Sequence, residues 1–196
     1  IDNYAEAEKI LLKEFTQTLF TVADDAYLNV EFNPDYIKEY RLLGFDNKVG
    51  AIKDKNAMIE GGEIGSAYST LVAFEIVPTR QGLLVANAGH IYNPVNFFLK
   101  YKYPNQNQEQ QVDESPAICF TPFTDLTPCY KFAASVVMFG SMLRKSRFVK
   151  DINWNDIIKM ASESADPRSY SQMEFVKMVE HAKEVYGKKR KKDRRD

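Results

Sequence analysis

The spacing of hydrophobic residues changes twice along the chain, from a helical period to a strand period and back to a helical one. Between Asn3 and Phe20, the residues Leu11, Phe15 and Leu19 recur every four positions, which predicts an amphipathic helix with one apolar stripe. Such a stripe needs another surface to pack against. We therefore expect this helix either to dock on the rest of the chain or to mediate self-association.

The middle of the chain alternates between apolar and polar residues, which is the pattern of half-buried β-strands. Leu28, Val30 and Phe32 alternate with polar neighbours up to a break at Asn33–Pro34, and the same alternation predicts a strand over 95–103. Four glycines in 48–66 indicate a loop whose turns need positive φ, and the polar stretch 104–115 predicts a hairpin or a connector. Further strand candidates cover 36–45, 69–77, 81–89 and 117–120.

Three helices are predicted in the last third of the chain. Thr127–Pro128 suits the N-cap and first turn of the first helix, and Gly140 inside this helix indicates the close approach of a neighbouring backbone. The second helix covers 153–164. Ser171 and Glu174 have the spacing of a capping box and predict the start of the third helix.

Together these elements predict an α+β fold. An antiparallel, sandwich-like β-rich unit is expected over 23–125, followed by a helical part over 126–187. The N-terminal helix belongs to 1–22, and 188–196 is expected to form a disordered basic tail.

Charge is unevenly distributed along the 196 residues, although the formal net charge is only -1. The tail 188–196 holds seven Lys or Arg and two Asp, which leaves 19 basic and 25 acidic residues in the rest of the chain. An acidic body argues against nucleic-acid binding by the folded part. The tail itself could bind nucleic acid or an anionic envelope polymer, but a solvated end is favoured. Cys119 and Cys129 either form a disulfide or stay as two thiols, and the sequence leaves both open.

Four segments of the chain carry a resemblance to a known family. They are 30–34 (VEFNP) with 40–47 (YRLLGFDN), 62–65 (GEIG) with 74–78 (FEIVP), 99–102 (LKYK), and 132–144 (FAASVVMFGSMLR). In order and spacing they resemble the C-terminal region of bacterial secreted von Willebrand factor type A (vWA) proteins of the YfbK-like kind. The resemblance covers nearly all of 1–187.

The resemblance implies a setting more than an activity. In that family a vWA domain precedes this region, and the segment 1–22 resembles its closing helix. The family often has His where Tyr68 stands, so a role of that His is not carried over to this chain. The resemblance implies a secreted, periplasmic or cell-envelope location, and it implies no known reaction. No apolar run approaches the length of a membrane span.

Residues with reactive or metal-binding chemistry are few. His90 and Cys119 could act as base and nucleophile, but no orienting third group or elbow motif accompanies them. Asp166, Ser169 and Ser171 do not have the Asp-x-Ser-x-Ser spacing of a vWA metal site, and we expect them at a helix start. We therefore expect no catalytic residue, no metal site and no cofactor.

The β region is rich in tyrosine, a residue that is common both in cores and at binding interfaces. Core and border positions are the first interpretation of these residues, and a binding face for protein or glycan is the second. The sequence therefore predicts a non-catalytic interaction or scaffold module that binds the vWA domain of its own chain, or an envelope or extracellular protein. The alternative is an accessory domain of an enzyme or of a protease-inhibitor-like protein. The candidate partner-binding residues are Tyr27, Tyr40, Tyr68, Tyr101 and Tyr103.

Overall fold

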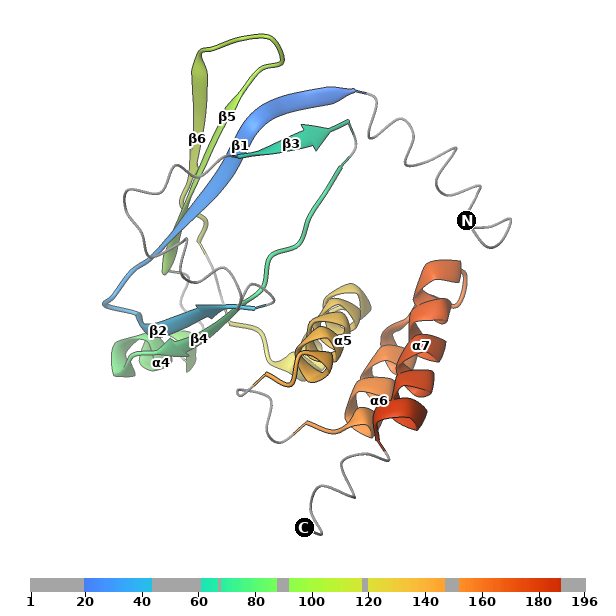
Figure 1. The fold of residues 1–196 in the computed structure, drawn as a ribbon. Coiled ribbons are helices and arrows are strands. Elements are labelled where there is room, and N and C mark those ends of the chain that lie inside the picture. Colours follow the sequence, from blue (N-terminus) through green and yellow to red (C-terminus); the bar gives the residue numbers. More distant parts are fainter. Residues whose placement is uncertain are drawn as a thin grey trace. The chain divides into compact units, whose positions relative to one another are not determined.

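The chain folds into two compact units, Ile1–Phe120 and Thr121–Asp196 (Figure 1). The computed structural model describes residues 20–43, 61–66, 68–87, 92–117, 120–146 and 152–187. Among the described residues, the first unit holds two antiparallel sheets and one helix, and the second holds three helices after a short 3₁₀ turn. The α+β class predicted from the sequence is confirmed. The predicted N-terminal helix and basic tail lie outside the described residues.

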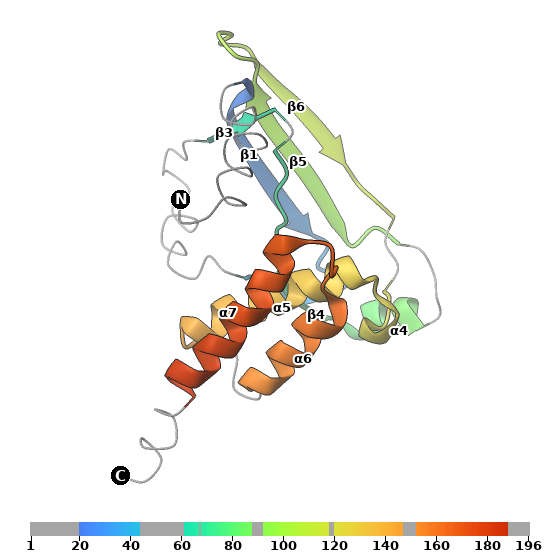
Figure 2. The same cartoon turned by 90° about the vertical axis from the view of Figure 1, so that its right-hand side faces the viewer.

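A four-stranded antiparallel sheet in the order β3-β1-β5-β6 forms the larger part of the first unit. Its strands are β1 (Thr21–Phe32), β3 (Gly62–Gly65), β5 (Val95–Lys102) and β6 (Glu109–Glu114). The strands β1, β5 and β6 lie side by side as a long ribbon (Figure 2). The strand predicted over 95–103 is confirmed as β5. β1 begins at Thr21, seven residues before Leu28, where the predicted alternation starts. β3 is a strand in a stretch where a glycine-rich loop was expected.

The second sheet pairs β2 (Ile37–Leu42) with β4 (Phe74–Pro78), and it confirms the two strand candidates 36–45 and 69–77 in shortened form. It meets the first sheet at the end of β1, where the ring of Phe32 stacks on Tyr40 at 4.4 Å and contacts Phe74 edge-on at 5.3 Å. Aromatic rings therefore join the two sheets at this end of the ribbon.

The strand candidate 81–89 was wrong, because the helix α4 (Arg80–Asn87) occupies this stretch. The Thr79 hydroxyl accepts a hydrogen bond from the Gly82 backbone N–H at 3.0 Å, which caps the first turn of the helix. Residues 118 and 119 of the candidate 117–120 lie outside the described residues, and Ala117 and Phe120 belong to no strand.

The expectation of positive φ in the glycine segment was also wrong for Gly61 and Gly62, because neither has a φ in the left-handed region. Gly61 is needed for a close approach instead. A Cβ atom on Gly61 would lie 2.2 Å from the carbonyl carbon of Asp25. The left-handed residue is Asp25 itself, with φ 50°, at an irregularity in β1.

The second unit begins with a 3₁₀ turn, η3 (Phe123–Asp125), and continues with α5 (Pro128–Leu143), α6 (Trp154–Ser164) and α7 (Tyr170–Tyr186). All three predicted helices are confirmed. Ile157 and Val179 are fully buried where these helices meet, and Phe139, Met142 and Ala182 complete the buried core.

Helix caps in this unit follow the sequence only in part. Thr127 is the N-cap residue of α5 but makes no side-chain capping bond, and α7 begins after Ser169 rather than with a capping box at Ser171. Asn153 caps α6 in a full capping box. The close approach expected at Gly140 is contradicted, because a Cβ atom there would meet nothing within 4 Å.

None of the described helices is both long enough and apolar enough to cross a lipid bilayer.

Candidate interaction surface

The ribbon of β1, β5 and β6 has two chemically different faces. Directly opposed residues of antiparallel strands point to the same face, and the face alternates along each strand. Leu28 opposes Leu99, which opposes Val112, so these three residues form an apolar row across three strands. The apolar and aromatic residues of this face, called the Leu28 face below, are Leu28, Val30, Phe97, Leu99, Tyr101 and Val112, and the polar Gln110 and Glu114 of β6 lie on the same face.

Two apolar residues of the Leu28 face are exposed to solvent. Leu28 is 48% exposed and Val112 is 42% exposed, while Leu99 between them is partly buried. Sheets are normally apolar on one face because that face is buried against a second layer. Leu28 and Val112 therefore leave apolar area open to solvent on this face.

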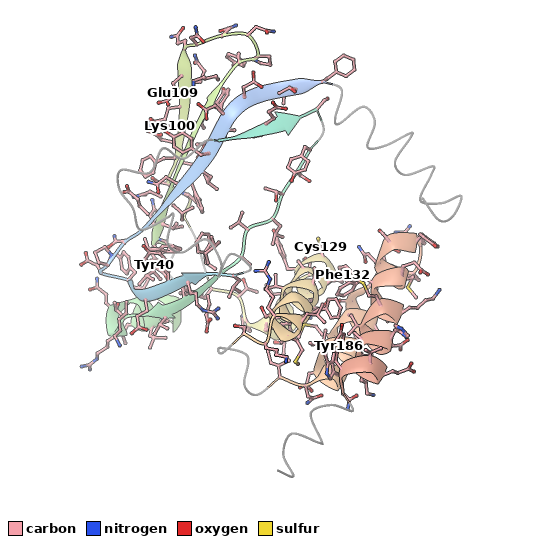
Figure 3. All side chains as sticks on the ribbon, viewed as in Figure 1. Tyr40, Lys100, Glu109, Cys129, Phe132 and Tyr186 are labelled. Carbon is pink, nitrogen blue, oxygen red and sulfur yellow. The ribbon has the colours of Figure 1, made fainter. Side chains whose placement is uncertain are left out.

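The opposite surface of the same ribbon, the Lys100 face, is charged and internally paired. Lys100 contacts Glu109 at 3.0 Å and Lys102 contacts Asp25 at 2.7 Å, and both pairs are partly exposed (Figure 3, Lys100 and Glu109). Tyr27 opposes Lys100 on this face. Charges that already have partners in the same sheet make this the solvated side of the ribbon.

Asp25 holds the start of β3 against β1. Its carboxylate accepts hydrogen bonds from the Lys102 ammonium at 2.7 Å and from the Gly61 backbone N–H at 2.8 Å. The hydrogen bond from Lys102 and the second one from Gly61 lower the pKa of Asp25 below its usual value. The same pair raises the pKa of Lys102.

The five candidate tyrosines do not form one patch. Tyr101 and Tyr103 come together: their hydroxyls are 3.5 Å apart and their rings meet edge-to-face at 5.5 Å. The hydrogen bond to Tyr103 raises the pKa of Tyr101. Tyr40 stacks on Phe32 in the two-stranded sheet and is still 60% exposed.

The other two candidate tyrosines lie apart from Tyr101. Tyr27 is on the opposite, charged face of the ribbon, as its pairing with Lys100 shows. Tyr68 follows β3 in the segment that leads to β4, and it is exposed. Tyr101 is thus the candidate that belongs to the Leu28 face, and Tyr103 extends that face at the end of β5.

Residues with reactive side chains are dispersed where the structure describes them. Cys129 is an exposed free thiol in the first turn of α5 (Figure 3), and His181 is an exposed residue of α7, 3.7 Å from Glu184. His90 and Cys119 lie outside the described residues. Within the described ranges, no group of three or more His, Cys, Asp or Glu side chains is placed to hold a metal ion.

A shallow groove of about 1080 Å³ lies between the start of α6 and the end of α7. Trp154 and Ile158 supply apolar lining, and Lys159, Glu180 and Lys183 are among its charged residues. The Trp154 ring also stacks on Tyr186, with 6.4 Å between the ring centroids. Both signs of charge line the groove, so its electrostatics favour no particular class of ligand.

Comparison with known proteins assigns the chain to a family. The model of the family "Uncharacterized protein YfbK, C-terminal" matches residues 17–185. The chain belongs to this family. Among curated proteins, "Uncharacterized protein YfbK" of Escherichia coli (strain K12) is 30% identical over 200 residues, which is 93% of this chain and 33% of that protein. The chain thus spans about a third of the length of this relative. No solved structure has detectable similarity to the chain.

The family assignment confirms the resemblance that the four sequence segments carry. It gives the chain a family and a relative, and both are described as uncharacterized. The family model begins at residue 17, inside the predicted N-terminal helix, so most of that helix precedes the matched region.

Of the apolar residues of the Leu28 face, Val112 alone has no counterpart in the alternation that the sequence shows. The alternation of Leu28, Val30 and Leu99 with polar residues is visible in the sequence, but the pairing of β1 with β5 is not. Val112 was missed because its strand, EQQVDE, has a single apolar residue. The regular alternation of apolar and polar residues in 95–103 could have pointed to Val112. A strand with that pattern needs a neighbour, and this favours a hairpin over a connector in 104–115.

Proposed function

We propose that this chain is a non-catalytic interaction or scaffold module of a vWA-domain protein. The observation that carries this proposal is the Leu28 face, on which Leu28 of β1 and Val112 of β6 remain exposed and Leu99 of β5 between them is only partly buried. Burying such a surface against a partner stabilises a complex by about 25 cal/mol for each Å² of apolar area removed from water. The module would bind its partner through this face and keep the charged Lys100 face in solvent.

The proposed partner is a protein: the vWA domain of the same polypeptide, or an envelope or extracellular protein. The first choice is motivated by the YfbK relative, because two thirds of that protein lie outside the region that this chain matches. A secreted, periplasmic or envelope location is part of the same proposal. Tyr101 and Tyr103 would contribute large, rigid aromatic contact area at the end of the face.

The test compares two pairs of substitutions in the full-length protein. Leu28→Ser with Val112→Ser removes apolar side chains from the Leu28 face, and Asn29→Ser with Gln111→Ser changes neighbouring residues that point to the Lys100 face. Proteins that co-purify with each variant are quantified by mass spectrometry against the unsubstituted protein.

The proposal expects bound partners to be lost from the Leu28 and Val112 variant and kept by the Asn29 and Gln111 variant. Equal circular dichroism spectra of the two variants would show that both remain folded. A Leu28 and Val112 variant that keeps every partner would overturn the proposal.

A further inference from the structure

We propose that the outer edge of β6 is a docking site for an extended, basic segment of another protein, which adds to the sheet as a further antiparallel strand. β6 is the last strand of the four-stranded sheet, and among the described residues it pairs with β5 alone (Figure 2). The inference goes beyond the proposed function, because it concerns the backbone edge of the ribbon and not the Leu28 face.

The edge of β6 offers hydrogen-bonding groups to a further strand. In an antiparallel pair, every second residue directs its backbone N–H and C=O away from the partner strand. β6 has six residues, so three of them present their backbone groups outward, over a strand length of roughly 20 Å. An added strand could therefore form a ladder of ordinary length.

β6 also lacks the features that usually protect a sheet edge. Short strands, prolines and bulges keep edges from pairing further. β3, at the other edge of the same sheet, has four residues and two irregularities in its pairing with β1, and β4 of the small sheet ends in Pro78. β6 contains no proline, and its pairing with β5 runs from Glu109 to Glu114 without a shift in register.

The side chains of β6 select a partner by charge. The strand contains Glu109, Asp113 and Glu114 and neither Lys nor Arg. Glu109 pairs with Lys100, but the ion pairs among the described strands include neither Asp113 nor Glu114, and both are exposed. Opposite charges on directly opposed residues stabilise a strand pair. Lys or Arg residues of the partner would therefore lie opposite Asp113 and Glu114.

Val112 adds an apolar requirement at the next position. Directly opposed residues share a face, so a partner residue opposite Val112 would lie on the Leu28 face. An apolar residue there would extend the row of Leu28, Leu99 and Val112 and cover part of Val112, which is 42% exposed. Read along the added strand, the preferred segment has two basic residues followed by an apolar one.

A second copy of β6 fits this edge less well. Two copies would bring together three carboxylates each and no basic residue. Antiparallel pairing over the full strand would place Glu109 of one copy opposite Glu114 of the other, and like charges in this position destabilise the pair. The carboxylates thus disfavour self-association and leave the edge open to a basic strand.

The test uses synthetic peptides and the complete 196-residue chain. The probe is a fluorescent, end-blocked peptide of sequence Lys-Lys-Val-Thr-Val-Lys, and its control has Glu in place of each Lys. Two further forms of the probe carry N-methyl groups on alternate backbone nitrogens, either the odd or the even ones. Fluorescence anisotropy should show saturable binding of the probe and none of the Glu control. Only one of the two methylated forms should bind, because only one set of nitrogens faces β6.

Two protein variants locate the binding. Asp113→Lys with Glu114→Lys should weaken the affinity for the probe about tenfold or more, since two attractive pairs become repulsive. Glu180→Lys with Glu184→Lys makes the same change in net charge at exposed positions of α7 and should leave the affinity unchanged.

Three results would overturn the inference: no saturable binding of the probe, equal binding of both methylated forms, or equal weakening by the two protein variants. The last two would show attraction by charge without strand addition at β6. The proposed function has a separate readout, the loss of partners from the Leu28 and Val112 variant, so either proposal can fail while the other stands.

Discussion

The contact between Gly61 and Asp25 allows a sharp test of how β3 is held on β1. In Gly61→Ala, the new Cβ atom would lie 2.2 Å from the Asp25 carbonyl carbon and 2.5 Å from the Ala26 nitrogen. Both neighbours are backbone atoms, so no side-chain rotation relieves the clash, and β3 must move away. The movement also weakens the 2.8 Å hydrogen bond from Gly61 to the Asp25 carboxylate.

The expected size of the effect follows from three contributions. Overpacking against backbone costs about 1–3 kcal/mol, and the hydrogen bond contributes about 1 kcal/mol. Alanine offsets about 0.4–1 kcal/mol of this loss, because it lowers the conformational entropy of the unfolded chain relative to glycine. We therefore expect a loss of about 2 kcal/mol in the free energy of opening this pair of strands, which corresponds to roughly 30-fold faster hydrogen exchange.

The assay is hydrogen exchange of peptides from β1 and β3, followed by mass spectrometry. Gly62→Ala is the matched control, because a Cβ atom at the next residue would meet nothing within 4 Å. The control should exchange at the rate of the unsubstituted chain or slightly more slowly. Equal rates for Gly61→Ala and Gly62→Ala would refute the close approach at Gly61.

Three further predictions concern a titration, a helix interior and a helix cap. The pKa of Asp25 is lower in the folded chain than its unfolded value of about 3.9, so the ionised Asp25 carboxylate stabilises the fold fully above that pH and loses this effect as the pH falls through the folded pKa. Asp25→Asn should therefore flatten the acid part of a circular-dichroism titration. An unchanged curve would contradict this. Gly140→Ala should stabilise the helical unit by about 1 kcal/mol in urea unfolding followed by the fluorescence of Trp154, since open space surrounds that position, whereas a loss of stability would reveal a packed neighbour. Asn153→Ala should cost about 1 kcal/mol in the same assay, and Ser169→Ala, which removes no capping bond, should cost much less; equal costs would speak against the capping box.

Local patterns in the sequence were sufficient where a single element determines its own structure. The alternation in 95–103 gave β5, and the apolar spacing of the last third gave α5, α6 and α7. Asn153 begins α6 because its side chain accepts from the backbone N–H of Asn155 and Asp156. Information of this kind lies within a few neighbouring residues and is therefore visible without the fold.

Where distant residues determine the structure, the sequence was misleading. The run around Leu83 is compatible with a strand or a helix. It forms a helix whose capping residue, Thr79, donates its hydroxyl to the carbonyl of Asp35, 44 residues away. Gly61 is a glycine because of Asp25, 36 residues away, and no pattern around Gly61 encodes that contact.

The candidate surface shows the same division. The tyrosines were identified by composition, but their distribution over two faces depends on the register of β1 with β5, which places Tyr27 opposite Lys100 and Leu28 opposite Leu99. A change of one residue in that register would exchange the faces. The Leu28 face could therefore be recognised only after the strands were paired.

Hydroxyl-radical footprinting of the full-length protein tests the central claim most directly, because it measures the solvent access of individual side chains. Leu84 on α4, which is 63% exposed, serves as the internal reference. If the Leu28 face is an interaction surface, Leu28 and Val112 will be oxidised far more slowly than Leu84 in the full-length protein. Oxidation of Leu28 and Val112 at a rate close to that of Leu84 would contradict the account.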